Sequence, residues 1–262
     1  MKKRGFTLAE VLITLGIVGV VAALTAPASV MSSRNEANAA RLSTVVSNME
    51  NAFQTAIAQE GVDNLYGTSL WEENRVDATS GNKARFVGRL GQYMILNGYK
   101  DNQAAFYGDG VQTHAMSNTG GVGQVANVFL VGGRPFVIET KNGAAIFIAA
   151  QRNAFNVGVK NEAINSGRTL YTQAAQVAID VNGKNGPNVF GRDIFFFVLG
   201  ENGVLYPYGG RDVTGINGNI DGTWDQANTV FSCTDDSKGN TPNVMGVGCT
   251  ARVIAEGYKI NY

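Results

Sequence analysis

The feature that most constrains this chain is a long apolar stretch close to its N-terminus. Residues 6–30 read FTLAEVLITLGIVGVVAALTAPASV and include a single charged side chain, Glu10. An α-helix of about 20 apolar residues spans the hydrocarbon core of a bilayer. Lys2, Lys3 and Arg4 come just before the stretch, and basic residues favour the cytoplasmic side of a membrane. The sequence therefore predicts a membrane-spanning helix, with the rest of the chain outside the cytoplasm.

An ordinary secretory signal peptide would explain the same hydropathy. Such a peptide has a basic start, an apolar stretch and a small-residue cleavage site, which Ala26-Pro27-Ala28 loosely fits. Two observations favour a retained helix instead. Glu10 lies at the front of the apolar run, and a carboxylate costs about 2.5–3.5 kcal/mol at the centre of a membrane helix, so it usually marks a functional contact. The helical pattern also continues without a break beyond residue 30.

The second half of this predicted helix, residues 31–61, is amphipathic. Its apolar residues recur in steps of three and four, which is the helical period; they are Leu42, Val45, Val46, Met49, Phe53, Ala56 and Ile57. Gly61 ends the pattern and is the expected C-cap. A helix of about 55 residues would be roughly 80 Å long at 1.5 Å per residue. We expect its outer half to lay one face on a globular head domain, residues 62–262.

Short β-rich runs dominate the head domain. We predict strands at the following ranges: 127–131, 135–140, 144–150, 174–181, 193–199 and 203–208. Asn142-Gly143 separates two of them and is a strong hairpin signal. Because strands that follow one another through tight turns pair antiparallel, the head should contain an antiparallel sheet. The long helix packed on this sheet gives an α+β fold.

Four further segments complete the prediction for the head. Residues 82–97 suggest a second helix, and residues 101–124 are Gly- and Asn-rich and read as a loop that holds the only histidine, His114. Near the C-terminus, residues 249–256 predict a short helix and residues 258–262 a final strand. A lone histidine in such a loop is more often solvated than catalytic.

The composition excludes several classes of function. The formal net charge is zero, and without the first five residues the chain has 18 basic and 21 acidic residues, so no basic surface indicates a nucleic-acid partner. The sequence contains no Ser/His/Asp arrangement, no His-rich metal motif and no phosphate-binding loop after a strand. We therefore expect a protein that is not an enzyme.

The N-terminal segment resembles a known class of processing signal. Gly5-Phe6-Thr7-Leu8-Ala9-Glu10-Val11 is similar to the class III signal of type IV pilins and type II secretion pseudopilins. The resemblance implies that a prepilin peptidase cuts between Gly5 and Phe6 and that Phe6 becomes the N-methylated first residue. It also implies that Glu10 pairs with the N-terminal amine of a neighbouring subunit. Gly19 and Pro27 match positions that bracket a segment which loses helicity when pilins assemble.

The resemblance carries expectations about function, partners and location. The chain would be a structural subunit of a type IV pilus or a secretion pseudopilus. Its partners would be copies of itself, other pilins, the peptidase and an inner-membrane assembly platform. It would start as a single-pass inner-membrane protein with a periplasmic head, and end in a cell-surface or periplasm-spanning filament. The alternative is an exported soluble binding protein or hydrolase whose ordinary signal peptide is removed.

Five oxygen-bearing side chains lie close together on a Gly-rich segment of the head: Asp180, Asn182, Asn185, Asn188 and Asp193. Hard oxygen ligands suit Ca²⁺, and some pseudopilins bind calcium in loops of their sheet. The segment is therefore a candidate calcium site, although it has no Glu at the position that an EF-hand requires. The alternative is a set of ordinary turn residues whose side chains cap their own backbone.

The two cysteines, Cys233 and Cys249, both lie near the C-terminus. With a single histidine in the chain they cannot build a usual structural zinc site. A disulfide is the better interpretation for a domain outside the cytoplasm, and pilins often carry a disulfide loop near the C-terminus. A bridge between Cys233 and Cys249 would close a loop of about 16 residues, which contributes ~3 kcal/mol to stability.

Overall fold

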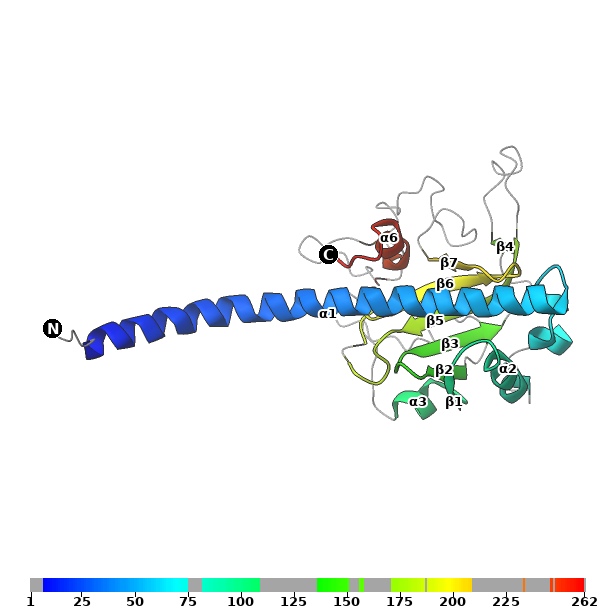
Figure 1. Cartoon of the computed structure of the whole chain (residues 1–262), viewed down its shortest axis with the longest axis horizontal. Coiled ribbons are helices and arrows are strands. Elements are labelled where there is room, and N and C mark those ends of the chain that lie inside the picture. Colours follow the sequence, from blue (N-terminus) through cyan, green and yellow to red (C-terminus); the bar gives the residue numbers. More distant parts are fainter. Residues whose placement is uncertain are drawn as a thin grey trace, which may run out of the picture.

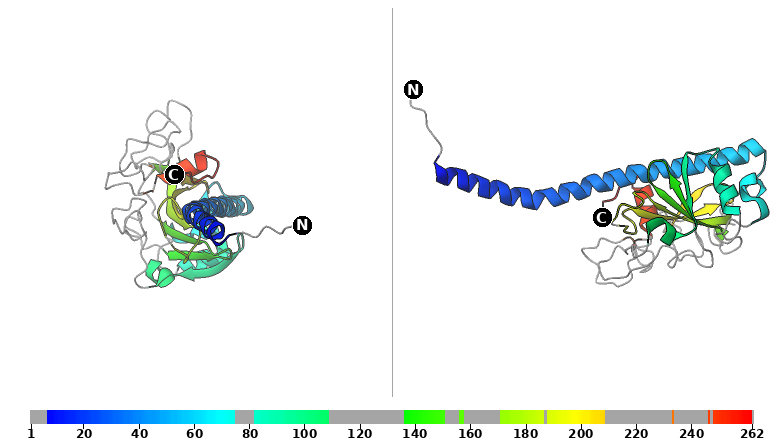
Figure 2. Two further views of the ribbon diagram at one scale, coloured as in Figure 1. Left: turned by 90° about the vertical axis from the view of Figure 1, so that its left-hand side faces the viewer. Right: turned by 90° about the horizontal axis from the view of Figure 1, so that it is seen from below.

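One long helix lies across one face of an antiparallel sheet (Figure 1). The computed structural model describes these residues: 7–74, 82–108, 136–150, 156–157, 171–186, 188–208, 233, 246 and 248–261. The first part of the helix projects beyond the head, and the second part crosses the strands (Figures 1 and 2). This arrangement confirms the predicted α+β, pilin-like fold.

The long helix α1 spans Leu8–Glu60 and has well-defined caps at both ends. At its start, the backbone N–H of Glu10 donates to the Thr7 hydroxyl at 3.2 Å, and the Glu10 carboxylate accepts from the Thr7 backbone N–H at 2.8 Å. This reciprocal pair is a capping box. At its end, Gly61 adopts a left-handed conformation with φ 65°, and its N–H reaches the carbonyls of Ala58 and Ile57. Glycine takes this conformation at little steric cost, so the predicted C-cap is confirmed.

The sheet has the strand order β1-β2-β3-β5-β6-β7, and every neighbouring pair is antiparallel. The two-residue strand β4, Asn156–Val157, pairs with β5 off this path. The strands on the path are β1 (Leu96–Lys100), β2 (Phe136–Thr140), β3 (Ala145–Ala150), β5 (Tyr171–Asp180), β6 (Ile194–Gly200) and β7 (Leu205–Pro207). Five of the predicted strands are confirmed, and the sixth, at 127–131, lies outside the described residues, as does His114.

The sheet buries apolar side chains on both faces. One face packs against α1, with Phe136, Phe195 and Phe197 in the same core as Phe53 of the helix. The other face carries a second core that includes Phe147 and Phe196. All seven residues of β6 are therefore buried. A strand that is covered on both faces has a continuous apolar sequence and not an alternating one, as the sequence IFFFVLG of β6 shows.

The segment between α1 and β2 differs from the prediction in two places. The helix α2 covers Asn82–Leu90 and stops there, so the predicted helix over 82–97 is too long. The last two residues of the predicted helical range belong instead to the edge strand β1, which pairs with β2. Here long-range strand pairing outweighs local helical periodicity. The predicted loop over 101–124 begins with a short helix, α3 (Gln103–Tyr107), which Asn102 caps through a hydrogen bond from the Ala105 N–H at 2.8 Å.

Two short 3-10 helices follow α1, η1 (Leu65–Gly67) and η2 (Ser69–Asn74). Trp71 of η2 is buried and meets the ring of Phe86 edge-on, with 5.4 Å between the ring centroids. The contact ties this region to α2.

At the C-terminus, the helix α6 spans Cys249–Ala255, which confirms the predicted short helix. The predicted final strand is wrong for residues 258–261, which form no strand. Gly257 and Tyr258 both have positive φ, 72° and 59°, and two successive left-handed residues turn the chain out of an extended path.

Candidate assembly surface and head-domain sites

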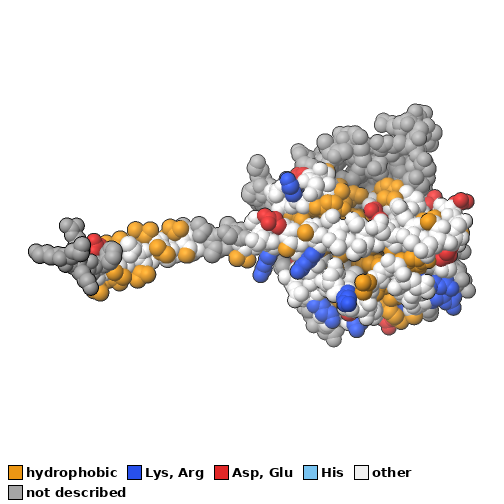
Figure 3. Space-filling model, in the orientation of Figure 1, with side chains coloured by type: hydrophobic (Ala, Val, Ile, Leu, Met, Phe, Trp, Pro, Cys, Tyr) orange, Lys and Arg blue, Asp and Glu red, His pale blue; other side chains and the backbone are white. Residues whose placement is uncertain are grey.

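Every apolar side chain that the structure describes in the first half of α1 is exposed. The exposed large hydrophobic residues there are Leu8, Val11, Leu12, Ile13, Leu15, Ile17, Val18, Val20, Val21, Val30 and Met31. Figure 3 shows these hydrophobic side chains along the part of the helix that projects from the head. A contiguous apolar surface of this kind marks a site of contact with a membrane or another protein. Within the residues whose side chains the structure describes, no helix is long and apolar enough to cross a bilayer.

Glu10 lies at the exposed tip of this half. Its carboxylate accepts hydrogen bonds from the Thr7 N–H at 2.8 Å and from the Thr7 hydroxyl at 2.9 Å. Gly5 and Phe6, the predicted cleavage site, lie outside the described residues. Sequence reasoning missed the role of Thr7, although the spacing Thr7-x-x-Glu10 is that of a capping box. Glu10 therefore has two possible tasks, a cap within its own helix and a charge for a second chain.

Gly19 and Pro27 both lie within α1, and the helix continues through them. A methyl group built on Gly19 would meet no atom within 4 Å. In the single chain, neither position interrupts the helix, so any loss of helicity between them belongs to an assembled state.

The second half of α1 is joined to the head by polar side chains as well as by its apolar stripe. Asn35 and Asn38 donate through Nδ2 to the carbonyl oxygens of Ile260 and Arg192, each at 3.1 Å. These bonds join the helix to segments that are more than 150 residues away in the sequence. No local pattern reveals such partners, and sequence reasoning missed them.

Two glutamates continue this series of polar contacts. Glu50 accepts from the Leu205 N–H at 2.9 Å, which ties the helix to β7. Burial raises the pKa of the Glu50 carboxyl, and the bond from Leu205 opposes the rise. Glu60 accepts from the backbone N–H of Ser69 at 2.6 Å and from its hydroxyl at 2.7 Å. Together these bonds set the register of the head along the helix.

The candidate calcium ligands sit at the turn between β5 and β6, and the turn brings most of them together. Asp180 is fully buried; one of its oxygens accepts from the N–H groups of Asn182 at 3.2 Å and Gly183 at 2.8 Å, and the other accepts from the Tyr107 hydroxyl. Asn185 is exposed and donates to the carbonyl of Asn182 at 3.1 Å. Burial raises the pKa of Asp180 to about 8.

Asp193 occupies the other side of the same turn. One of its oxygens accepts from the Asn188 N–H at 2.9 Å and from Asn182 Nδ2 at 3.2 Å, and the other accepts from the Val189 N–H. Burial raises its pKa to about 6. The side-chain oxygens of Asn182 and Asn188 are buried and find no hydrogen-bond partner among the described residues.

The fit of Ca²⁺ to this turn can be judged from the donor set. Calcium takes six to eight oxygen ligands, whereas all four carboxylate oxygens of Asp180 and Asp193 already accept hydrogen bonds from this chain. Two amide oxygens remain unpartnered, and no group of three acidic, His or Cys side chains suited to a metal occurs among the described residues. The arrangement favours a self-capped turn, and the calcium site stays a prediction.

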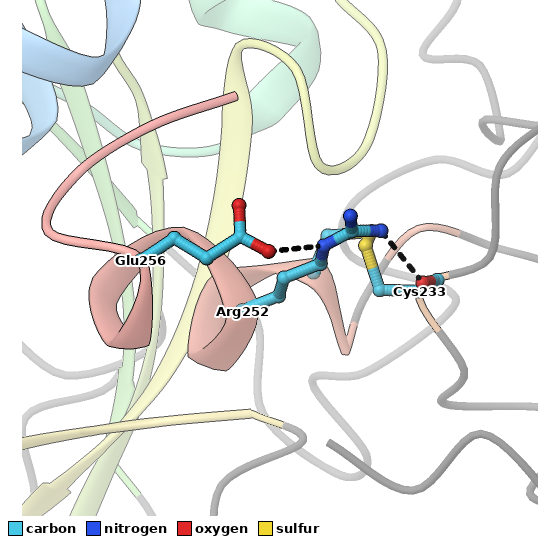
Figure 4. A network of polar contacts seen from close by, with 4 residues as sticks. Cys233, Arg252 and Glu256 are labelled. Carbon is cyan, nitrogen blue, oxygen red and sulfur yellow. Dashed lines mark hydrogen bonds and ion pairs between the residues drawn. A yellow bond between two sulfur atoms is a disulfide. The ribbon is translucent and has the colours of Figure 1, made fainter. Parts of the chain in front are cut away.

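The C-terminal helix α6 is held by a disulfide to Cys233 and by polar contacts, one of which reaches the sheet. Cys233 and Cys249 form the predicted disulfide. Arg252 donates to the Cys233 carbonyl at 3.2 Å and to the Glu256 carboxylate at 2.8 Å, as Figure 4 shows. The Phe196 N–H of β6 donates to the Thr250 hydroxyl at 2.9 Å. These contacts hold α6 beside the end of β7.

Comparison with known families identifies the N-terminal segment. Residues 1–26 match the family described as the prokaryotic N-terminal methylation motif. No curated protein and no solved structure matches the chain. The chain thus carries the class III prepilin signal of type IV pilins and pseudopilins.

Proposed function

We propose that this chain is a structural subunit of a type IV pilus or a type II secretion pseudopilus. A prepilin peptidase would cut after Gly5, Phe6 would be N-methylated, and the subunit would enter a helical filament through α1. The observation that carries the proposal is the exposed apolar half of α1, most of which lies within the methylation motif at residues 1–26. Such a surface needs an apolar environment, since each exposed apolar Å² costs about 25 cal/mol relative to burial.

Lipid and neighbouring helices can each supply that environment. Before assembly, residues 6–30 would span the inner membrane with the head in the periplasm, and an assembly platform in that membrane would extract the subunit. In the filament, which would be on the cell surface or span the periplasm, the same residues would pack against copies of this chain and other pilins. Gly19 and Pro27 would let the helix unwind locally there, because Gly and Pro weaken helices.

Glu10 would set the register between neighbouring subunits. Cleavage frees the amine of Phe6, and a buried carboxylate left without a partner costs several kcal/mol. Pairing Glu10 with the amine of a neighbour removes this cost at a single relative position of the two helices. In the lone chain its partner is Thr7, so assembly would exchange or extend an existing set of hydrogen bonds.

The mature N-terminus is the first test of this function. Mass spectrometry of the protein from its native membrane should find N-methylated Phe6. A mature protein that begins near Ser29 would instead establish the alternative, an exported soluble binding protein or hydrolase with an ordinary signal peptide.

Two substitutions at Glu10 separate its cap from its charge. Glu10→Gln preserves the capping box, since Gln serves at this position as Glu does, but it removes the charge. We expect both Glu10→Gln and Glu10→Ala to be cleaved normally and to form no regular filaments. Glu36→Ala, an exposed position on the same helix, is the control and should assemble. Normal filaments from Glu10→Gln would sink the charge-pairing hypothesis.

A further inference from the structure

A cleft of about 440 Å³ lies between α1, the connection that follows α2, and the turn between β2 and β3. Asn48 and Asn51 line it from the helix, Tyr93, Met94 and Ile95 from the connection, and Lys141 from the turn. The cleft lies in the head-facing part of α1, away from the methylation motif.

The two asparagines of the cleft have unused hydrogen-bonding groups. Asn48 and Asn51 are exposed, and within the described part of the chain their side chains make no hydrogen bond. Asn is a poor residue for a helix interior because its side chain competes for backbone groups. The other asparagine pair of the helix, Asn35 and Asn38, has the same spacing and holds backbone carbonyls of the head. Asn48 and Asn51 are thus equipped to hold backbone groups that this chain does not supply.

The opposite side of the cleft is apolar. The side chain of Ile95 is 71% exposed, and Tyr93 and Met94 are half-buried beside it. Among the described residues, every other exposed large hydrophobic side chain belongs to α1 between Leu8 and Met31. Ile95 is therefore the one such side chain that the described head leaves in water.

We propose that this cleft is a contact between subunits, which receives a surface segment of a second copy of this chain. The proposal rests on the filament function above and extends the contact from the N-terminal half of α1 to the head. Lys141 is the only charged residue among the described residues that line the cleft. A chain without its first five residues has 18 basic and 21 acidic residues. A second copy thus brings an excess of acidic groups to a cleft with one ammonium group.

The physical roles in this contact follow from the lining. The carboxamides of Asn48 and Asn51 bind backbone carbonyl and N–H groups of the neighbour, as Asn35 and Asn38 bind carbonyls within the chain. Ile95 buries apolar surface against the neighbour, and Lys141 meets a carboxylate. A flat aromatic platform suited to a sugar ring is lacking in the lining, where Tyr93 is half-buried in contact with the core.

Photo-crosslinking in assembled filaments tests the identity of the occupant. A photoreactive amino acid at position 95 of the full-length chain should yield covalent dimers of this chain in filaments. A crosslink to a different protein, or intact filaments without such dimers, would overturn the inference and leave the proposed function standing. If the wild-type chain forms no filaments and lacks N-methylated Phe6, the proposed function fails and takes the inference with it.

Substitutions in the cleft separate contact from folding. The double variant Asn48→Ala, Asn51→Ala should keep or raise the melting temperature of the head, because Ala favours helix, while filament yield falls about tenfold, which corresponds to about 1.4 kcal/mol. Ile95→Asp should lower the yield at least as much, and Thr55→Asp, an exposed site on α1 outside the lining, is the matched control. Unchanged yield in both cleft variants contradicts the inference, as does a loss of yield that only follows a loss of stability.

Discussion

The two halves of α1 share one continuous helix but have opposite relations to the rest of the molecule. From Leu8 to Met31 the described side chains are exposed and mostly apolar, whereas from Ala39 to Ala56 a stripe of side chains is fully buried against the sheet. The second half also has hydrogen bonds to distant segments, through Asn35, Asn38 and Glu50. The comparison teaches that helical structure alone does not define the role of a residue. The folded head covers one half, and the proposed membrane or filament would cover the other.

The largest expected effect is a loss of head stability on substitution in the second half of α1, which a substitution in the first half should not cause. Phe53 is fully buried in the core between α1 and the sheet, and it lies beside Gly203 in the turn before β7. Phe53→Ala should lower the free energy of unfolding by about 3–5 kcal/mol, because it removes buried surface and leaves a cavity. Leu15→Ala, at a side chain that is 63% exposed, should leave the unfolding of the head unchanged. Urea denaturation of the full chain in detergent measures both, and equal losses would break the comparison.

The disulfide is the next largest contribution to the head-facing half. Reduction, or the double substitution Cys233→Ser, Cys249→Ser, opens a loop with a sequence separation of 16 residues and should cost ~3 kcal/mol. Because Ile260, the partner of Asn35, follows α6, protection of the backbone around Asn35 from hydrogen exchange should fall as well. Exchange in the exposed half should not change. An equal stability of the reduced and oxidised protein would show that α6 is held by its polar contacts alone.

The buried carboxylates at the β5–β6 turn should make the stability of the head depend on pH. The pKa values of Asp180 and Asp193 are raised to about 8 and about 6, above the usual value for Asp. Such groups contribute fully below about pH 4, and the contribution is lost as the pH rises from there through 6 to 8, at up to about 1.4 kcal/mol per pH unit for each group. Thermal melts from pH 5 to 8.5 should therefore show a falling melting temperature, and Asp180→Asn should flatten the curve.

Calcium is tested on the same turn. At pH 8 a self-capped turn predicts no heat of binding and no rise in melting temperature with millimolar Ca²⁺. A rise that Asp193→Asn abolishes would establish the calcium site with Asp180, Asn182, Asn188 and Asp193 as its centre, and the exposed side chain of Asn185 at its margin.

The smallest expected effect is a change in head stability on replacing Glu50, in comparison with Glu10 in the other half of α1. Burial raises the pKa of Glu50, so its contribution is present below pH 4 and is lost as the pH rises through its folded pKa. Glu50→Gln keeps an acceptor for the Leu205 N–H and removes the half-buried charge, so it should be neutral or stabilising by less than about 1 kcal/mol at pH 7. Glu10→Gln should leave head stability unchanged. A large loss at Glu50→Gln would mean that the charge itself joins helix and sheet.

Much of the fold follows from local sequence patterns, and the exceptions have physical causes. The helical period, Gly61 and the five strands predicted between residues 135 and 208 are correct, because each prediction rests on neighbours in the sequence. The end of α2 and the edge strand β1 were missed because pairing with β2 decides them. The capping box at Thr7 could have been found from its spacing. The contacts of Asn38 and Glu50 could not, since their partners are more than 150 residues away.

The sequence by itself determined that this protein begins with a class III prepilin signal, continues as one long helix and closes a disulfide near its C-terminus. These features depend on short motifs, on periodicity and on a single possible cysteine pair. Only the tertiary structure decided which polar residues of the helix hold the head and how Asp180 and Asp193 come to share one turn. It also decided which asparagines beside Ile95 find no partner among the residues that the structure describes. Those facts depend on contacts between segments far apart in the chain, and such contacts exist only once the sheet has formed.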